Sequence, residues 1–366
     1  MDREYVQMIY EKLHVIPEPG FREYKTSELI SSELEKIGYT VHRNVGDTTG
    51  IIAVLNSKQD GPILGIRADM DALTYAINGN IEYRHSCGHD AHSSMVLAAA
   101  KEIYSMGINK GKLYLIFQPA EELLAGANAM INSGLLNDMT EIVGIHLRPI
   151  QEAKLSQAAA ALWHSAAAPV RIKLTGVGAH GARPHLGVNA VEAAVLITNA
   201  INALKANPSI SHSIKVTKIN TGAGPDNAIP DEANMYVDVR CIENNEMETI
   251  LEKLRIAIES TAKANGANVE YTIDLCPAAE YTDELIETNS EAIKETLGEK
   301  GLIKNLYTAG SEDFHFYAKR LGCKAGYLGL GSDLTPGLHH KDMKFNREAM
   351  YYGVDILIKV ICKRLM

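Results

Sequence analysis

The sequence predicts an α/β fold interrupted by a smaller α+β unit, and three observations lead to this prediction. Short apolar runs typical of buried strands alternate with longer segments of helical periodicity at both ends of the chain. Between residues 166 and 277 the order changes to strand, helix, two strands, helix and strand. The length of 366 residues also exceeds what one hydrophobic core usually supports, so we expect two domains.

The outer parts of the chain supply the larger α/β domain. Apolar residues at helical spacing cover residues 5–13, 26–38, 92–107, 283–298 and 347–366. Short β-type runs begin at Ile51, Ile63, Lys112, Glu141 and Ala325. The second helix ends at Gly38, a common helix terminator. Because strands and helices alternate on both sides of the central region, we expect residues 1–165 and 278–366 to form one domain.

The central region supplies the inserted unit. Strand-like runs cover residues 169–178, 213–222, 232–241 and 268–275, and helical periodicity covers 189–205 and 246–266. The order β-α-β-β-α-β is that of a ferredoxin-like unit. We therefore expect residues 166–277 to fold as a separate insertion.

Composition excludes several classes of partner. The formal net charge is -9 and no basic run is present, which argues against nucleic acid as the main partner. No stretch approaches the roughly 18 apolar residues of a membrane span. The acidic N-terminus lacks the apolar region of a signal peptide, and five scattered cysteines do not suggest a disulfide framework. A cytoplasmic protein is the simplest expectation.

Side chains that bind metals well follow several predicted strands. Carboxylates or an imidazole come after three of them: Asp69 and Asp71, then Glu121 and Glu122, then His146. The segment HSCGHDAH, residues 85–92, opens the helix between the first two of these strands, and His339 and His340 lie near the C-terminus. Functional groups in open α/β sheets collect beyond the carboxyl ends of strands, so we expect these side chains at one rim.

Thiolate, imidazole and carboxylate donors in this number could bind two divalent ions. Such donors suit zinc, cobalt, nickel or manganese better than magnesium or calcium. A pair of ions lowers the pKa of water and polarises a carbonyl group, and a carboxylate that is not a ligand can accept the water's proton. Adjacent glutamates can also be a solvated surface pair, and Asp71 a turn or cap residue. The joint placement of the donors favours the metal site.

Eight motifs in order now identify a resemblance: LHVIPEPGFREYKT, RADMDAL, HSCGHDAH, FQPAEE, GIHLRP, AHGARPHLGVNAV, GSEDF and LHHKDMKFN. They resemble the di-metal amidohydrolase branch of the aminoacylase and carboxypeptidase-G superfamily, which includes hippurate hydrolase, N-acyl-amino-acid amidohydrolases, auxin-conjugate hydrolases and N-acetyldiaminopimelate deacetylase. The likeness covers about residues 4–355. It implies a di-zinc-peptidase-like catalytic domain with an inserted lid domain that commonly dimerises.

The resemblance also implies roles for individual residues. The positions of the family's metal ligands are occupied by Cys87, His89, Glu122, His146 and His339. Glu121 matches its general base, and Asp71 matches the carboxylate that supports a ligand or tunes the base. His340 falls where the family accepts other residues, so we interpret it as a supporting or surface residue.

Three residues of the inserted domain match positions that the family associates with substrate. His180 matches a histidine that reaches a neighbouring subunit's active site and stabilises the oxyanion. Asn227 and Arg240 match substrate-binding residues, and the planar fork of arginine suits a carboxylate. In the alternative interpretation, His180 is a turn residue, Asn227 a loop cap and Arg240 one half of an ion pair.

The sequence departs from the family pattern at a few positions. Thr74 and Lys341 stand where proline is common, and Arg84 replaces a small or apolar residue and places a cation near the proposed metals. Trp163 and His164 lie in an unusual domain junction. None of these changes removes a proposed ligand or the base, but they bear on which substrate fits.

The function implied by the resemblance is hydrolysis of N-acyl amino acids, such as N-acetyl or N-benzoyl derivatives. It implies two divalent ions per subunit, manganese or zinc in the first place and cobalt or nickel in the second, and a homodimer or higher homo-oligomer. A dipeptidase or aminopeptidase that uses the same ions is the first alternative, and a non-catalytic metal- or ligand-binding protein is the second. Glu121 weighs against a pure binding protein, which needs no base beside a ligand glutamate.

Overall fold

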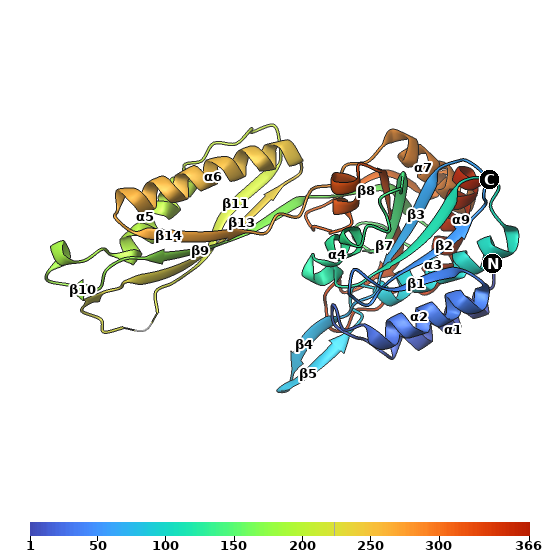
Figure 1. The fold of residues 1–366 in the computed structure, drawn as a ribbon, viewed down its shortest axis with the longest axis horizontal. Coiled ribbons are helices and arrows are strands. Elements are labelled where there is room, and N and C mark those ends of the chain that lie inside the picture. Colours follow the sequence, from blue (N-terminus) through green and yellow to red (C-terminus); the bar gives the residue numbers. More distant parts are fainter. Residues whose placement is uncertain (223) are drawn as a thin grey trace. The chain divides into compact units, whose positions relative to one another are not determined.

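The computed structural model describes residues 1–222 and 224–366, which divide into two compact units (Figure 1). The first unit comprises Met1–Trp163, Glu280–Thr308 and Glu312–Met366. The second comprises His164–Ala279 and Ala309–Ser311. Each unit has a hydrophobic core of its own, and the predicted α/β class is confirmed.

The first unit is built on a sheet in which eight strands lie within the described residues. Their order across the sheet is β1 (Thr40–Val45), β2 (Gly50–Asn56), β6 (Lys112–Gln118), β3 (Ile63–Asp69), β7 (Glu141–Pro149), β16 (Lys324–Leu334), β8 (Ala158–His164) and β15 (Leu302–Thr308). The neighbours β6, β3, β7 and β16 are parallel, whereas β2 joins β6 and β8 joins β16 in antiparallel fashion. The carboxyl ends of four central strands therefore lie at one edge.

Helices cover both faces of this sheet. Residues of α1 (Arg3–His14), α2 (Tyr24–Ile37), α3 (His89–Met106), α7 (Asp283–Leu297) and α9 (Glu348–Leu365) share the larger apolar cluster. Residues of α4 (Gly126–Asn132) and α8 (His315–Leu321) belong to the cluster on the other face. The side chains of β6 alternate between the two faces of the sheet. Leu113, Leu115 and Phe117 belong to the first cluster, and Tyr114 and Ile116 belong to the second.

A short hairpin, β4 (Leu73–Ile77) and β5 (Asn80–Arg84), projects from the first unit immediately before the HSCGHDAH segment (Figure 1). Its two turn residues, Asn78 and Gly79, have φ values of 51° and 81°. Positive φ at both positions is what a two-residue hairpin turn requires, and Asn-Gly is the favoured pair.

The second unit is a four-stranded antiparallel sheet with two helices on one face (Figure 1). In chain order its elements are β9 (Ala166–Thr175), α5 (Ala190–Asn202), β11 (His212–Asn220), β13 (Glu232–Cys241), α6 (Asn244–Ala264) and β14 (Asn268–Ile273). A separate small pair, β10 (Ala179–His180) and β12 (Ala228–Ile229), follows the end of β9. In both units, no helix among the described residues combines the length and the apolar character needed to span a membrane.

Candidate metal centre

The parallel strands deliver the predicted donors to one edge of the sheet. Strand β3 ends at Asp69 and leads to Asp71, and β6 leads within three residues to Glu121. His146 lies in the last part of β7, and the chain after β16 reaches His339. The remaining donors, Cys87 and His89, lie at the start of α3. Local strand and helix ends therefore explain why residues far apart in sequence approach one another.

The structure brings all five predicted ligands together. The Cys87 Sγ atom lies 3.4 Å from His146 Nε2 and 3.4 Å from His339 Nε2. Glu122 Oε1 lies 3.4 Å from His339 Nε2 and 3.9 Å from His89 Nε2. Cys87, His89 and His146 form one group able to hold an ion, and Cys87, Glu122 and His339 form a second. The thiol of Cys87 is common to both groups.

Two of the imidazole rings are oriented by hydrogen bonds on the side away from these groups. His146 Nδ1 lies 2.7 Å from the Leu147 carbonyl oxygen, which can only accept, so Nδ1 carries the proton. His89 Nδ1 lies 3.1 Å from Asp71 Oδ1. Each arrangement leaves the Nε2 lone pair directed toward the other donors, as a metal-ligating histidine requires.

The unsatisfied chemistry of these donors fits a pair of cations. Both His89 Nε2 and Glu122 Oε1 are buried, and neither atom has a hydrogen-bond partner among the described residues. Burial raises the pKa of the Glu122 carboxyl to about 7 and raises the pKa of the Cys87 thiol well above its usual range. Burial also lowers the pKa of His146, which keeps this ring neutral. Divalent cations would neutralise the negative charge of the carboxylate and thiolate, and they would give His89 Nε2 and Glu122 Oε1 a bonding partner.

Glu121 and Glu122 are held by a strained turn. They begin the 3₁₀ turn Glu121–Leu123, which is flanked by Ala120 at φ 51° and Leu124 at φ 52°. Non-glycine residues in this region cost about 1–3 kcal/mol each and persist only where neighbours fix them. The Ala120 amide donates to the buried Glu23 carboxylate, and the Glu122 amide donates to Asp71 Oδ2 at 3.1 Å. Asp71 thus supports His89 and Glu122 together.

The surroundings of Glu121 disfavour its ionised form, as is typical of a side chain that accepts a proton. Its side chain is buried beside His89, with Oε2 at 3.9 Å from His89 Nε2. Burial, followed by the nearby Glu312 and Glu122 carboxylates, raises the pKa of Glu121 well above its ordinary value. A carboxylate with a raised pKa is a stronger base at neutral pH, which suits a group that accepts and returns a proton.

Arg67, a residue without a role among the sequence-based predictions, lies beneath the rim and compensates part of this negative charge. Arg67 is fully buried and contacts Asp69 Oδ2 at 2.6 Å, Glu312 Oε1 at 2.9 Å and Asp313 Oδ1 at 3.1 Å. Tyr327 donates a further hydrogen bond to Glu312. Arg67 lies inside the apolar run of β3, where a charge is unusual, and this position was the available signal.

Asp69 and His92 form a supporting pair and not a third metal group. The Leu147 amide donates to His92 Nε2 at 2.9 Å, so His92 Nδ1 carries the proton and donates to Asp69 Oδ1 at 2.7 Å. Asp69, His89 and His92 lie close enough to hold an ion, but both ring nitrogens of His92 are already engaged. The pair fixes α3 against β3 and β7 directly behind the donors.

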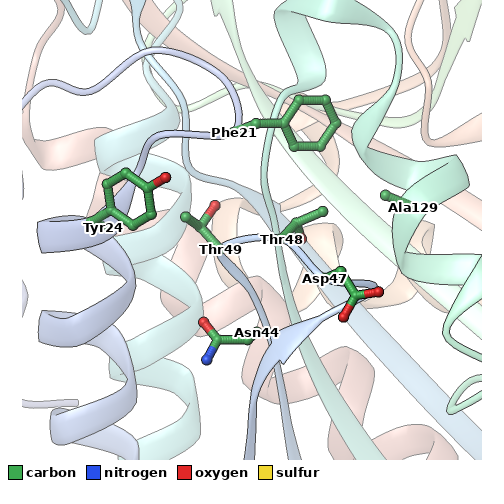
Figure 2. Close-up of a pocket in the computed structure, with 7 residues that line it drawn as sticks. All are labelled: Phe21, Tyr24, Asn44, Asp47, Thr48, Thr49 and Ala129. Carbon is green, nitrogen blue, oxygen red and sulfur yellow. The ribbon is translucent and has the colours of Figure 1, made fainter.

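The first unit also contains a pocket of 520 Å³ that lies apart from the donor groups (Figure 2). Its lining residues are Phe21, Tyr24, Asn44, Asp47, Thr48, Thr49 and Ala129. The Thr49 hydroxyl donates to the same Glu23 carboxylate that accepts from Ala120. Because the lining contains one carboxylate and neither histidine nor cysteine, this pocket does not provide the donors of a metal centre.

The three predicted residues of the second unit do not lie together. His180 in β10 pairs with Ala228, and the amide of Gly181 donates to the carbonyl of Asn227, so His180 and Asn227 are close neighbours. Arg240 pairs with Ala167 at the start of β9, whereas β10 follows the opposite end of that strand. The Arg240 Nε atom donates to Asp238 at 3.1 Å.

Comparisons with known proteins agree with this architecture. A profile of the peptidase family M20/M25/M40 matches residues 65–363. Hippurate hydrolase of Campylobacter jejuni is 32% identical to the chain, over 95% of the chain and 94% of the relative. Thermostable carboxypeptidase 1 of Saccharolobus solfataricus is 29% identical, over 90% and 87% respectively. The Bacillus subtilis YXEP protein, a dinuclear metal-binding peptidase of the M20 family, shares the fold with a TM-score of 0.79 at 23% identity, over 100% of both chains.

Proposed function

The chain belongs to peptidase family M20/M25/M40, and from that premise we propose that it is a metal-dependent amidohydrolase of N-acyl amino acids. The reaction releases a free amino acid and a carboxylic acid. The hippurate hydrolase relative, whose name denotes cleavage of an N-acyl amino acid, supports this substrate class.

One observation carries the proposal above the others. A buried carboxylate, Glu121, is adjacent in sequence to a predicted ligand, Glu122, and the two face the same imidazole nitrogen at 3.9 Å. Glu121 also lies in two groups of donors that could hold an ion, one with His89 and Glu122 and one with Glu312 and Asp313. We assign it to proton transfer because the five proposed ligands already form two ion-holding groups without it. A proton acceptor beside two ion-holding groups is the arrangement that hydrolysis needs.

The proposed ligands are Cys87, His89, Glu122, His146 and His339, which would hold two divalent ions. Ions bound there supply Lewis-acid polarisation of a carbonyl group and lower the pKa of water. Manganese or zinc is the proposed pair, with cobalt or nickel as alternatives, because the donor set mixes thiolate, imidazole and carboxylate. The dinuclear metal-binding peptidase that shares the fold is consistent with two ions.

The chain's own residues then supply proton transfer and orientation. Glu121 accepts the proton of the attacking water and passes it to the leaving amine, and the burial that raises its pKa makes its carboxylate a stronger proton acceptor. Asp71 orients His89 through Nδ1 and holds the Glu122 amide, so it keeps two ligands in place. Arg67 balances the carboxylates beneath Glu121 without touching the substrate side.

The second unit contributes substrate recognition in this proposal, as a lid and dimerisation domain. Arg240 binds the substrate carboxylate with Asn227 as a further polar contact, and His180 stabilises the oxyanion in the site of a neighbouring subunit. The positions of His180 and Arg240 at opposite ends of β9 support roles in different active sites of a homodimer or higher homo-oligomer. A cytoplasmic setting completes the proposal, because an odd number of cysteines scattered along the chain does not suggest a disulfide framework.

Cleavage of small peptides is the second candidate. The carboxypeptidase relative favours it, because the same proton acceptor and ions serve a peptide bond. A non-catalytic binding protein is the weaker alternative, because such a protein needs no proton acceptor like Glu121 beside a ligand glutamate. Initial rates on N-acetyl and N-benzoyl amino acids and on dipeptides, each with manganese or zinc, separate the three. Turnover of dipeptides alone would favour the peptidase, and inactivity across the panel would favour the binding protein.

The role of Glu121 is tested by Glu121→Gln with Glu287→Gln as a matched control. Glu287 is an exposed residue of α7, so its substitution should leave turnover unchanged. Glu121→Gln should keep its bound metal and lose about 10²–10⁴-fold in kcat, the usual contribution of a positioned base. Metal content by mass spectrometry and kcat are measured together. A fully active Glu121→Gln enzyme would contradict the assignment.

A further inference from the structure

A pocket of 460 Å³ lies in the first unit beside the metal centre, and its chemistry is unlike that of the centre itself. Its lining residues are His14, Pro17, Tyr83, Arg84, His85, Ser86, Lys341, Asp342, Met343 and Lys344. None of them belongs to the groups able to hold an ion. The volume lies within the range of sites for small molecules.

A buried histidine whose ring nitrogens lack hydrogen-bond partners among the described residues lines this pocket. His85 is 6% exposed, and neither of its ring nitrogens has a hydrogen-bond partner among the described residues. Burying an unpaired polar group costs free energy, so a partner is expected there. In either protonation state at least one ring nitrogen carries a proton, and His85 can therefore donate a hydrogen bond to a bound group.

The other polar side chains give the pocket an excess of positive charge. The lining contains three cationic side chains, Arg84, Lys341 and Lys344, and one carboxylate, Asp342. A second carboxylate, Glu82, forms an ion pair with Arg84 at 2.7 Å. Lys341 Nζ lies 2.7 Å from Asp342. Lys344 is exposed, and its ammonium has no ion pair or hydrogen bond in the part of the chain that the structure describes. Positive charge and unfilled donors both favour an anion.

The pocket wall is tied to the loops that carry two of the proposed ligands. Ser86 precedes Cys87, and its carbonyl accepts the amide of His339 at 2.9 Å. The Arg84 guanidinium donates to the Lys341 carbonyl at 2.9 Å, which joins the end of the β4–β5 hairpin to the segment after His339. Two of the positions at which the sequence departs from the family pattern, Arg84 and Lys341, therefore meet in this pocket.

We propose that this pocket is a second binding site, separate from the metal centre, for a small oxyanion bearing a carboxylate or phosphate group. Arg84, Lys341 and Lys344 bind the anionic oxygens, and His85 donates to the ligand at the buried end. The site does not depend on the proposed hydrolysis, because none of its residues is a proposed ligand or the base.

Inorganic phosphate and acetate, titrated separately into the metal-loaded protein by calorimetry, test the proposal. Lys344→Gln and Arg84→Gln should each weaken binding about tenfold, the effect of losing one charge-assisted hydrogen bond. Lys304→Gln, an exposed lysine elsewhere in the first unit, is the matched control and should bind as the unaltered protein does. Binding of acetate as well as phosphate would identify a carboxylate ligand, and binding of phosphate alone a phosphorylated one.

Arsenate soaked into crystals of the metal-loaded protein locates the oxyanion by anomalous scattering. A peak between His85 and Lys344 is the expected result. A peak confined to the metal centre, or affinities of both variants within about twofold of the unaltered protein, would overturn the proposal. If Arg84→Gln fails to fold because its contacts with Glu82 and Lys341 are lost, Lys344→Gln alone carries the test.

Discussion

Replacing Arg67 by methionine should destabilise the first unit severely, although it removes an unfavourable burial of charge. The side chain is 0% exposed and holds three carboxylates, those of Asp69, Glu312 and Asp313, within 3.1 Å. Methionine fills a similar volume but leaves those carboxylates in an apolar interior without their cation. Removing one partner of a buried ion pair costs about 3–5 kcal/mol, so we expect a loss of that size in the free energy of unfolding.

Arg43 provides a matched comparison at the surface. It also binds two carboxylates, Glu35 at 2.9 Å and Glu28 at 2.5 Å, but all three side chains are at least one-third exposed. Surface ion pairs contribute about 0–1 kcal/mol, so Arg43→Met should lose less than about 1 kcal/mol. The substitution is the same at both positions, so the difference between the two losses reflects the burial of Arg67 together with its additional carboxylate partner.

The single tryptophan makes the assay specific to the first unit. Trp163 lies in that unit, and its Nε1 donates to Asn305 at 2.9 Å, so its fluorescence should report when the unit unfolds. Urea titrations give the midpoint and slope for each variant. The loss for Arg67→Met should also shrink as the pH falls, because protonation neutralises the abandoned carboxylates. Equal losses for the two variants, or a loss below about 1 kcal/mol for Arg67→Met, would refute the reasoning.

Two substitutions test contacts around the proposed metal centre, and a third tests a buried histidine of α8. Asp71→Asn should weaken metal affinity about tenfold, because Asp71 orients His89, and competition with a chelator measures the change. Tyr75→Phe should lower metal affinity in the same assay, since the Tyr75 hydroxyl holds the His339 carbonyl at 2.8 Å; unchanged affinity would dismiss this contact. Burial lowers the pKa of His315 from 6.5 to about 3, so the unfolded chain binds a proton that the folded chain does not, and stability falls as pH drops from 6.5 toward 3. His315→Gln should flatten that fall by up to about 1.4 kcal/mol per pH unit in urea titrations, and an unchanged slope would show that His315 does not titrate this way.

Much of the rim was predictable because its signals are local. The strands β3, β6 and β7 are mostly apolar, with Arg67 inside β3 as an exception, and the carboxylates that follow β3 and β6 stand out from them. Parallel strands then place those carboxylates at one edge without any knowledge of distant contacts. Which donors act as ligands came from the resemblance, and the structure brings those five side chains within reach of one another.

Features that depend on distant partners were not predictable in this way. Strand β8 is alanine-rich, and alanine has a low preference for strands, so only its burial between β16 and β15 makes it one. His92 stands in the same motif as Cys87 and His89, but the amide of Leu147, on another strand, occupies its second nitrogen. The β4–β5 hairpin is difficult to predict although Asn78 and Gly79 are a strong turn signal, because its strands are short and partly exposed.

The order in which the chain is synthesised conflicts with the order of strands in the large sheet. Strand β16 lies between β7 and β8, yet it is made after the whole of the second unit. A nascent chain that has emerged as far as Ala279 has its inserted unit nearly complete, whereas the larger sheet still lacks a central strand and the helix α9 that covers it. Domains generally fold as units during translation, so the insertion should fold on the ribosome while the surrounding sheet awaits the synthesis of β16 and α9. A ribosome stalled before β16 should therefore carry a protease-resistant insertion flanked by protease-sensitive catalytic segments.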